Sequence, residues 1–334
     1  MDILIKSFNR PYYLDRCLFS IQKHAKSSYE RIVVLDDGTP IKYLTKIQEK
    51  YPHVEITTSD LYDKKSSNLT ESYNGEIPIN FWVKSASKSS NYFLLLEDDF
   101  WFTDDLDLAE IEKNIAEDNL VFFKLFWLGN PKLTSQNIIG NSTFYNIVQP
   151  RLFTWNPFLY KKIFKTYGFR FNNVMKFLGL YTTERNLAYY HIYSVAGSIF
   201  KKDYFVSLWK NNKGKVDEGL QIQNALEYLK INSNSKIAHS KKEYFQTGFS
   251  TAATITHKKY AGINLDMFEV NNYLNEAWFN NQFDVFSSLP KDINEFEIEQ
   301  ILNSADSEGK LKAEWKKWHD KFKNQYEKLG CKTE

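Results

Sequence analysis

Runs of consecutive apolar residues alternate with segments of helical spacing along the first hundred residues. The runs at residues 3–5, 32–35 and 92–96 lack polar alternation, which is typical of strands buried on both faces of a sheet. In residues 14–21, apolar side chains recur every three or four positions, as they do in an amphipathic helix. This order predicts an α/β fold with a mostly parallel sheet, right-handed crossovers and flanking helices.

The pattern predicts further elements along the chain. We expect a short strand near residues 54–57, a helix over 79–87 and a strand over 120–127. The polar segment 59–74 and the segment 141–157 are predicted as loops. From about residue 261 the sequence is rich in asparagine and then helical, so we expect a helical C-terminal extension.

Acidic residues follow two of the predicted strands. Asp36 and Asp37 come after the second run, and residues 97–99 (Glu-Asp-Asp) end the run at 92–96. The first strand ends beside Arg10. The carboxyl ends of parallel strands share one edge of a sheet, where open α/β sheets bind ligands. Two carboxylates about 4 Å apart repel by roughly 4 kcal/mol at an effective dielectric near 20, so the cluster needs solvent, a shared proton or a cation.

Composition narrows the choice of function. The chain has 334 residues, of which 43% are hydrophobic and 25% charged, as expected for a globular protein with a substantial core. The net charge of +2 creates no strong positive field that would favour binding of nucleic acid. The two cysteines, Cys17 and Cys331, form no metal motif or disulfide framework. No apolar run is long enough to span a bilayer, and the sequence predicts a cytoplasmic protein.

The three junctions together resemble a known family. Residues 5–11 (Ile-Lys-Ser-Phe-Asn-Arg-Pro) and 36–39 (Asp-Asp-Gly-Thr) are similar to family 2 glycosyltransferases of the GT-A, Rossmann-like fold. Residues 97–99 resemble the Glu-Asp-Asp form of the DxD motif, as in N-acetylglucosaminyltransferase I. The resemblance implies a nucleotide-sugar-binding half in residues 1–105, an acceptor-side half in 106–260 and the helical extension in 261–334.

The same resemblance implies roles for individual residues. Asp36 would meet the donor base, Arg10 the nucleotide phosphate, and Asp98 the ribose or donor sugar. Asp99 would bind Mn²⁺ or Mg²⁺, hard ions that prefer oxygen ligands and offset the charge of a departing diphosphate. We also expect Ser7 and Asn9 to bind the nucleotide, together with Arg10, Asp36 and Asp98.

The acceptor half of the resemblance rests on residues 191–239. An acid pair, Asp217 and Glu218, stands at a predicted helix start, where the family places its general base. Helix capping explains the same pair equally well, and the sequence does not choose between the two carboxylates. His239 lies downstream, at a place where many members of the family have a further metal ligand.

The predicted function is therefore a metal-dependent, inverting glycosyltransferase that transfers a hexosyl or N-acetylhexosaminyl group. Its donor would be UDP-linked and its acceptor a glycan or a lipid-linked molecule. The alternatives are a sugar nucleotidyltransferase, which needs a glycine-rich loop absent from residues 7–11, and a non-catalytic carbohydrate-binding protein. Residues 310–326 form a basic amphipathic helix, which could rest peripherally on a membrane or dock its aromatic stripe on the protein.

Overall fold

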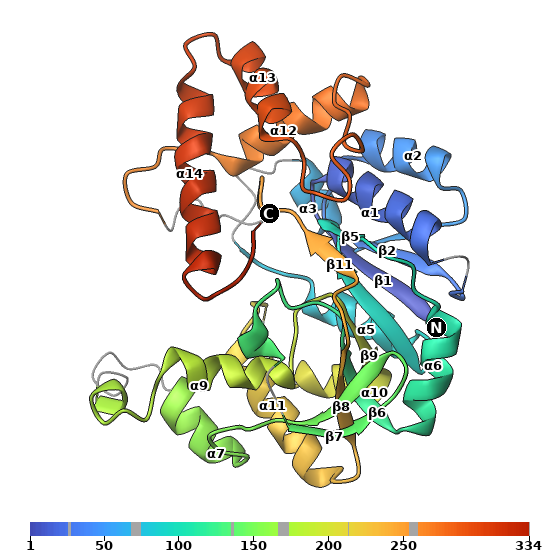
Figure 1. Ribbon diagram of the computed structural model, residues 1–334. Coiled ribbons are helices and arrows are strands. Elements are labelled where there is room, and N and C mark those ends of the chain that lie inside the picture. Colours follow the sequence, from blue (N-terminus) through green and yellow to red (C-terminus); the bar gives the residue numbers. More distant parts are fainter. Residues whose placement is uncertain are drawn as a thin grey trace. The chain divides into compact units, whose positions relative to one another are not determined.

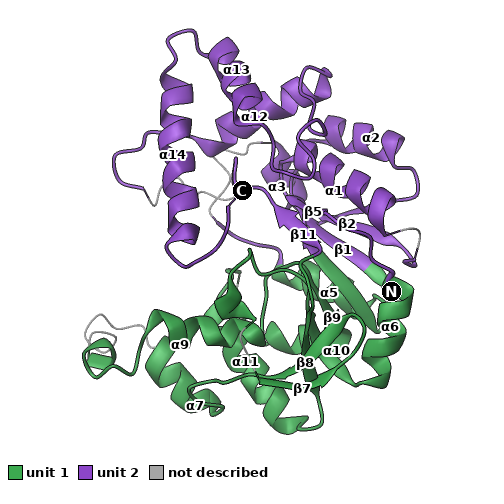
Figure 2. Ribbon diagram, in the orientation of Figure 1, with its two compact units in different colours: residues 1–2, 79–95, 108–243 green, residues 3–78, 96–107, 244–334 purple. Residues whose placement is uncertain are grey.

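The computed structural model describes residues 1–25, 28–67, 75–134, 137–165, 174–212, 214–253 and 260–333. The chain divides into two compact units (Figure 2). Unit 1 comprises residues 1–2, 79–95 and 108–243, and unit 2 comprises residues 3–78, 96–107 and 244–334. The chain passes from one unit to the other within the strand that leads into the acidic motif.

Unit 2 contains the parallel strands that the sequence predicts (Figure 1). Their order is β3-β2-β1, with β1 (Asp2–Ser7), β2 (Ile32–Asp36) and β3 (Glu55–Thr58). Ser7 of β1 lies opposite Asp36 of β2 in the register. The connecting helices are α1 (Pro11–His24) and α2 (Ile41–Lys50), and both bury an apolar side. Pro11 at the first position of α1 supplies a backbone angle that is already helical.

Unit 1 contains a mixed sheet in which most neighbours are antiparallel. Its strands follow the order β4-β9-β6-β10-β8-β7, with β10 and β6 the parallel pair. The strands are β4 (Tyr92–Glu97), β6 (Leu120–Lys124), β7 (Asn137–Asn141), β8 (Tyr145–Gln149), β9 (Ser198–Lys201) and β10 (Lys236–Ser240). The predicted α/β class, with its sheet flanked by helices, is confirmed.

The helices of unit 1 are short except for α11. They are α5 (Ile79–Ser87), α6 (Leu108–Glu117), η1 (Pro131–Leu133), α7 (Pro157–Tyr160), η2 (Lys161–Lys165), α9 (Thr183–Leu187), η3 (Ala188–His191), α10 (Lys202–Leu208) and α11 (Glu218–Ile231). The apolar positions Leu108, Ile111 and Ile115 form the buried side of α6.

Two predicted loops contain regular structure. The segment predicted as a loop over 59–74 includes helix α3 (Tyr62–Ser67), whose Lys65 is buried beside Asp37, while residues 68–74 lie outside the described residues. The segment 141–157 includes β8, which pairs with both β7 and β10. The loop prediction was wrong for residues 62–67, and the segment predicted to be rich in loops contains one strand, which pairing with β7 and β10 forms.

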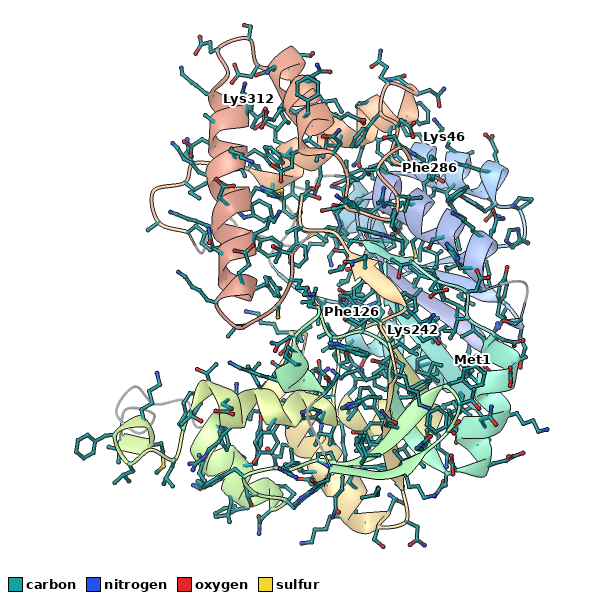
Figure 3. The ribbon with its side chains drawn as sticks, viewed as in Figure 1. Met1, Lys46, Phe126, Lys242, Phe286 and Lys312 are labelled. Carbon is teal, nitrogen blue, oxygen red and sulfur yellow. The ribbon has the colours of Figure 1, made fainter. Side chains whose placement is uncertain are left out.

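Helices α12 (Met267–Phe279), α13 (Glu295–Ala305) and α14 (Lys310–Glu327) form the predicted helical C-terminal part, within unit 2. Trp315 and Trp318 of α14 are fully buried, and Phe322 packs on Phe249. These residues of the aromatic stripe of α14 therefore pack on its own unit, and peripheral contact of residues 310–326 with a membrane stays a prediction. Lys46 of α2 (Figure 3) donates to the carbonyls of the last residues of α12. None of the described helices has the length and apolar character needed to span a membrane.

A small second sheet of unit 2 joins the acidic motif to the chain beyond β10. Strand β5 (Phe100–Phe102) pairs antiparallel with β11 (Phe245–Thr247). Just after β11, the Gly248 N–H donates to the carbonyl of Asp99 over 2.9 Å. A Cβ atom at Gly248 would lie 2.4 Å from the ring of Tyr13, which is fully buried. Only glycine fits between α1 and the motif at this point.

We predict that Gly248→Ala lowers the free energy of unfolding by about 1–3 kcal/mol, because the buried ring of Tyr13 cannot move aside. Gly140→Ala is the matched control, since its new methyl would meet the flexible end of Ile147 at 3.2 Å. Urea denaturation of both variants measures the difference. Equal stability of the two variants would show that the packing at Gly248 is not the constraint described here.

Candidate functional site

The turn from β1 into α1 is shaped by buried polar contacts. Asn9 has a positive φ of 53°, in the left-handed region that asparagine tolerates better than most residues. Its N–H donates to the Thr39 hydroxyl over 2.8 Å, and Asn275 of α12 donates to its carbonyl and its side-chain oxygen. The turn therefore aims the next residue, Arg10, away from the β1 strand direction and into the interior of unit 2.

Arg10 is the cation of the acidic motif. Its side chain is 4% exposed, and its guanidinium forms ion pairs with Asp98 and, at 2.9 Å, with Asp99. The Thr251 carbonyl lies 3.5 Å from the same group, and the Tyr13 ring centroid lies 5.4 Å from it. The sequence predicted that the acidic residues 97–99 need solvent, a shared proton or a cation. The guanidinium of Arg10 supplies a positive charge to two of them, Asp98 and Asp99.

Asp98 is fully engaged inside the protein. Its backbone N–H donates to the Lys6 carbonyl over 2.9 Å, which places the motif beside the end of β1. One carboxylate oxygen accepts from Arg10 and the other accepts from the Phe8 N–H over 3.1 Å. Burial raises the pKa of Asp98, and the charge of Arg10 opposes that rise. In this structure Asp98 anchors Arg10 and the turn after β1.

Asp99 differs from its neighbour. Oδ2 pairs with Arg10, whereas Oδ1 is buried and has no hydrogen-bond partner among the described residues. Burial raises the pKa of Asp99 to about 7, Arg10 opposes the rise, and the negative charge of Asp98 adds to it. A carboxylate oxygen without a partner is costly unless something else binds it. Its chemistry fits a hard divalent cation.

Asp36 closes the turn after β2. One oxygen accepts from the N–H groups of Gly38 (3.0 Å) and Thr39 (2.8 Å), and the other accepts from the Thr39 hydroxyl (2.6 Å). Burial raises the pKa of Asp36, and these hydrogen bonds oppose the rise. Ser7 and Asn9 lie next to this turn, so the structure brings together in unit 2 every residue predicted to bind the nucleotide. Contact of Asp36 with a donor base stays a prediction.

A loop before α13, residues 285–292, supports this site. The Trp101 side chain donates to the Pro290 carbonyl over 2.7 Å, and Arg16 donates to the carbonyls of Val285 and Lys291. The carboxylate of Asp292 accepts from the Phe249 N–H (2.8 Å) and from the Ser250 (3.0 Å) and Tyr13 (2.9 Å) hydroxyls.

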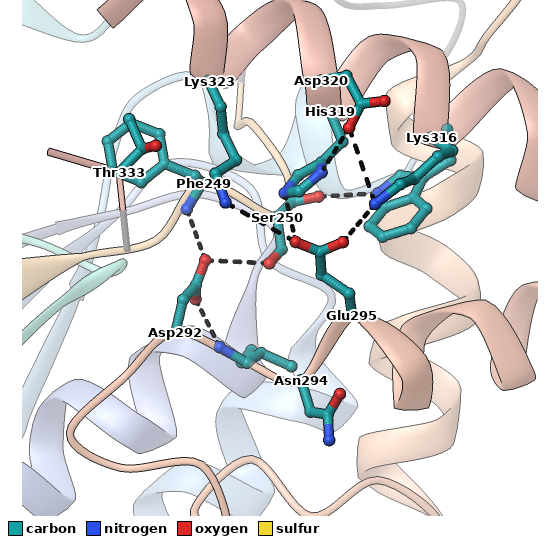
Figure 4. A network of polar contacts seen from close by, with 12 residues as sticks. Phe249, Ser250, Asp292, Asn294, Glu295, Lys316, His319, Asp320, Lys323 and Thr333 are labelled. Carbon is teal, nitrogen blue, oxygen red and sulfur yellow. Dashed lines mark hydrogen bonds and ion pairs between the residues drawn. The ribbon is translucent and has the colours of Figure 1, made fainter. Parts of the chain in front are cut away.

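Figure 4 shows Asp292 beside a second cluster, in which Glu295 pairs with Lys316 at 2.5 Å and lies 3.7 Å from His319 and Lys323 of α14. The Glu295 contacts join α13 to α14 just beyond the loop that carries Asp292. Sequence reasoning missed Asp292, because nothing in the local pattern shows that residues 249 and 292 meet.

The predicted base candidates lie in unit 1. Asp217 is the N-cap of α11: Oδ1 accepts from the Leu220 N–H over 2.9 Å, and Oδ2 pairs with Lys165 at 2.9 Å. Glu218 accepts a hydrogen bond from the Tyr190 hydroxyl. The capping interpretation therefore applies to Asp217, while the side chain of Glu218 takes no part in the cap.

His239 is buried in β10 of unit 1. Its ring stacks on His191, with centroids 5.0 Å apart, and its Nδ1 has no hydrogen-bond partner among the described residues. Burial lowers the pKa of His239, and it lowers that of His191 to about 3. Burial likewise lowers the pKa of nearby Lys124 to about 7. Neutral imidazole is the form that ligates metals, but ligation by His239 stays a prediction.

Within the described ranges, no group of three His, Cys, Asp or Glu side chains could hold a metal ion. A metal at Asp99 would therefore need water or a bound molecule among its other ligands, which is common for Mg²⁺ and its phosphate substrates. The residues present fit that arrangement, since Asp99 offers one oxygen without a partner.

Comparisons with known proteins give distant likenesses. No family model matches the chain, and no curated protein does. Among solved structures, the chain is similar to S. aureus TarS 1-349, with a TM-score of 0.40, 13% identity, and coverage of 97% of this chain and 72% of that one. It covers 42% of the longer TarS structure.

The chain is also similar to glucosyl-3-phosphoglycerate synthase from Mycobacterium tuberculosis, in complex with Mn²⁺, UDP and phosphoglyceric acid. The TM-score is 0.40, the identity 9%, and the coverage 85% of this chain and 79% of that one. At these scores the likenesses carry no argument about activity, and the function proposed below rests on the residues of this chain.

The raised pKa of Asp99 predicts a pH dependence of stability. Between its ordinary value of 3.8 and about 7, the unfolded chain ionises this carboxyl while the folded protein keeps it protonated. The unfolded state then binds fewer protons, so the free energy of unfolding falls as pH rises through this window. Relative to Asp99→Asn, the wild type should lose on the order of 4 kcal/mol across the whole window. Urea denaturation across the window measures this, with the exposed residue Asp60→Asn as control. Parallel curves for wild type and Asp99→Asn would contradict the assignment.

Proposed function

We propose that the protein is a metal-dependent glycosyltransferase of the GT-A fold that uses a nucleotide-diphospho-sugar, with UDP as the nucleotide. The observation that carries the proposal is the pairing of Arg10 with an acid that keeps one oxygen without a partner, Asp99. An arginine and a metal-binding carboxylate side by side are suited to a diphosphate, which is both a bidentate hydrogen-bond acceptor and a metal ligand.

Different residues of unit 2 would bind the metal, the diphosphate and the nucleoside. Asp99 would hold Mn²⁺ or Mg²⁺, and Arg10 would bind the diphosphate. Asp98 orients Arg10, and the turn formed by Ser7, Asn9 and Asp36 would receive the nucleoside. A divalent ion, when bound, offsets the negative charge that develops on the departing diphosphate. His239 remains a candidate for a further ligand.

For the acceptor we propose inversion with a carboxylate of unit 1 as general base. Glu218 is favoured over Asp217, because both oxygens of Asp217 are engaged by Leu220 and Lys165. The base would take the proton of the acceptor hydroxyl as that oxygen attacks the anomeric carbon and the bond to the diphosphate breaks. A hexosyl or N-acetylhexosaminyl donor and a glycan or lipid-linked acceptor complete the proposal.

We predict that UDP with Mn²⁺ raises the melting temperature, and that Asp99→Ala abolishes this shift because its carboxylate is the metal ligand. Differential scanning fluorimetry with UDP, GDP, CDP and their sugars, with and without Mn²⁺, measures it. Asp104→Ala is the control, an acid close in sequence but outside the Glu-Asp-Asp motif.

An undiminished shift in Asp99→Ala would contradict the metal assignment. Metal-dependent release of UDP from a UDP-sugar separates an enzyme from a carbohydrate-binding protein of the same fold. Pyrophosphate formation from UTP and a sugar phosphate would instead indicate a nucleotidyltransferase.

The base assignment gives a second prediction. Glu218→Gln should lower kcat by about 10²–10⁴-fold, the usual contribution of a general base, and leave UDP binding unchanged. Asp217→Ala should mainly reduce stability, by about 1 kcal/mol, because it removes the side-chain cap of α11. Steady-state transfer kinetics and urea denaturation of both variants separate the roles, and the opposite pattern would assign the base to Asp217.

A further inference from the structure

Arg10 has a second property that follows from its contacts. In the described part of the chain its two terminal nitrogens are occupied, one by Asp98 and the other by Asp99 and Thr251, while its Nε is buried without a partner. The two acids therefore fix the position of the guanidinium, but they leave its Nε–H without an acceptor. An unmet donor of a buried arginine marks a place where a further acceptor can bind.

The two ion pairs of Arg10 are not equivalent. Asp98 is fixed on both sides, because its second oxygen accepts from the Phe8 N–H. Among the described residues Asp99 has no such second bond, and its side chain is 13% exposed. The contact between Arg10 and Asp99 is thus the one that can open without uncovering another buried group.

Two cations compete for Asp99. While Arg10 stays on Oδ2, its positive charge repels a divalent ion at the same carboxylate. A diphosphate offers the guanidinium two oxygens at once, which suits its fork geometry better than the single contact with Asp99. Arg10 can therefore exchange Asp99 for the diphosphate while Asp98 still holds it.

Resting on the function proposed above, we propose that Arg10 is a shared counter-ion that makes binding of the metal and of the nucleoside diphosphate mutually dependent. Without nucleotide, Arg10 pairs with Asp99 and weakens the hold of that carboxylate on a divalent cation. With a diphosphate bound, Arg10 turns to the phosphate oxygens and leaves Asp99 free for the metal.

The first test is the affinity for Mn²⁺ alone, measured at pH 8 by electron paramagnetic resonance of free Mn²⁺. Arg10→Gln should bind Mn²⁺ about 5–150-fold more tightly than wild type, the usual range of coupling between two sites. It should also bind UDP more weakly in EDTA. Lys6→Gln is the matched control, because it removes one positive charge that pairs with Glu97 of the same motif and not with Asp99.

Four outcomes are decisive. Tighter Mn²⁺ binding in Arg10→Gln but not in Lys6→Gln supports the proposal. Equal changes in both variants would show a general effect of charge and overturn it, as would unchanged affinity in Arg10→Gln. If neither wild type nor variant binds Mn²⁺ with UDP, the proposed function itself fails.

A second measurement uses the unaltered protein, in case Arg10→Gln does not fold. The NMR signal of the Arg10 Nε–H, assigned with the Arg10→Lys variant, should shift on addition of UDP in EDTA and not on addition of uridine. If the Arg10 Nε–H chemical shift stays unchanged at a UDP concentration at which UDP binds, the proposal is overturned.

Discussion

The ion pairs of Arg10 with Asp98 and Asp99 are the interaction on which the site depends. Enclosing a guanidinium beside two carboxyl groups is costly, and removing one partner would leave the others uncompensated. The turn after β1, the end of β4 and the loop at Thr251 all converge on this guanidinium. The arrangement of unit 2 around its sheet edge therefore follows from a requirement of charge balance.

The C-terminal helices extend that constraint across unit 2. Asp292 fixes residues 249 and 250, and Gly248 just before them bonds to the backbone of Asp99. Trp101, two residues after Asp99, is anchored by the Pro290 carbonyl. A helical extension that looks separate in the sequence is thus part of the support of the acidic motif, and its aromatic stripe serves packing.

The sequence predicted the parallel strands of unit 2 but not the contacts between the elements. The apolar runs locate β1, β2 and β4, because strands buried on both faces need little else to be recognised. It also identified Arg10 and the acids as a group, from their places at strand ends. It could not show that Arg10 pairs with Asp98 across 88 residues, since that depends on tertiary packing. For the same reason the sequence did not show which of Asp217 and Glu218 is the candidate base, and it did not reveal the supporting role of Asp292.

Asp98 and Asp99 show why position within a motif is not enough to assign a role. The two carboxyls are adjacent and chemically identical, and Arg10 contacts both, although Asp98 is 2% exposed and the Asp99 side chain 13%. The Phe8 N–H reaches Asp98 and engages its second oxygen, whereas Oδ1 of Asp99 has no hydrogen-bond partner among the described residues. Contact of Asp98 with the ribose or donor sugar stays a prediction. Since a strand shifted by one residue would exchange these environments, the register of β4 decides which acid is available for chemistry.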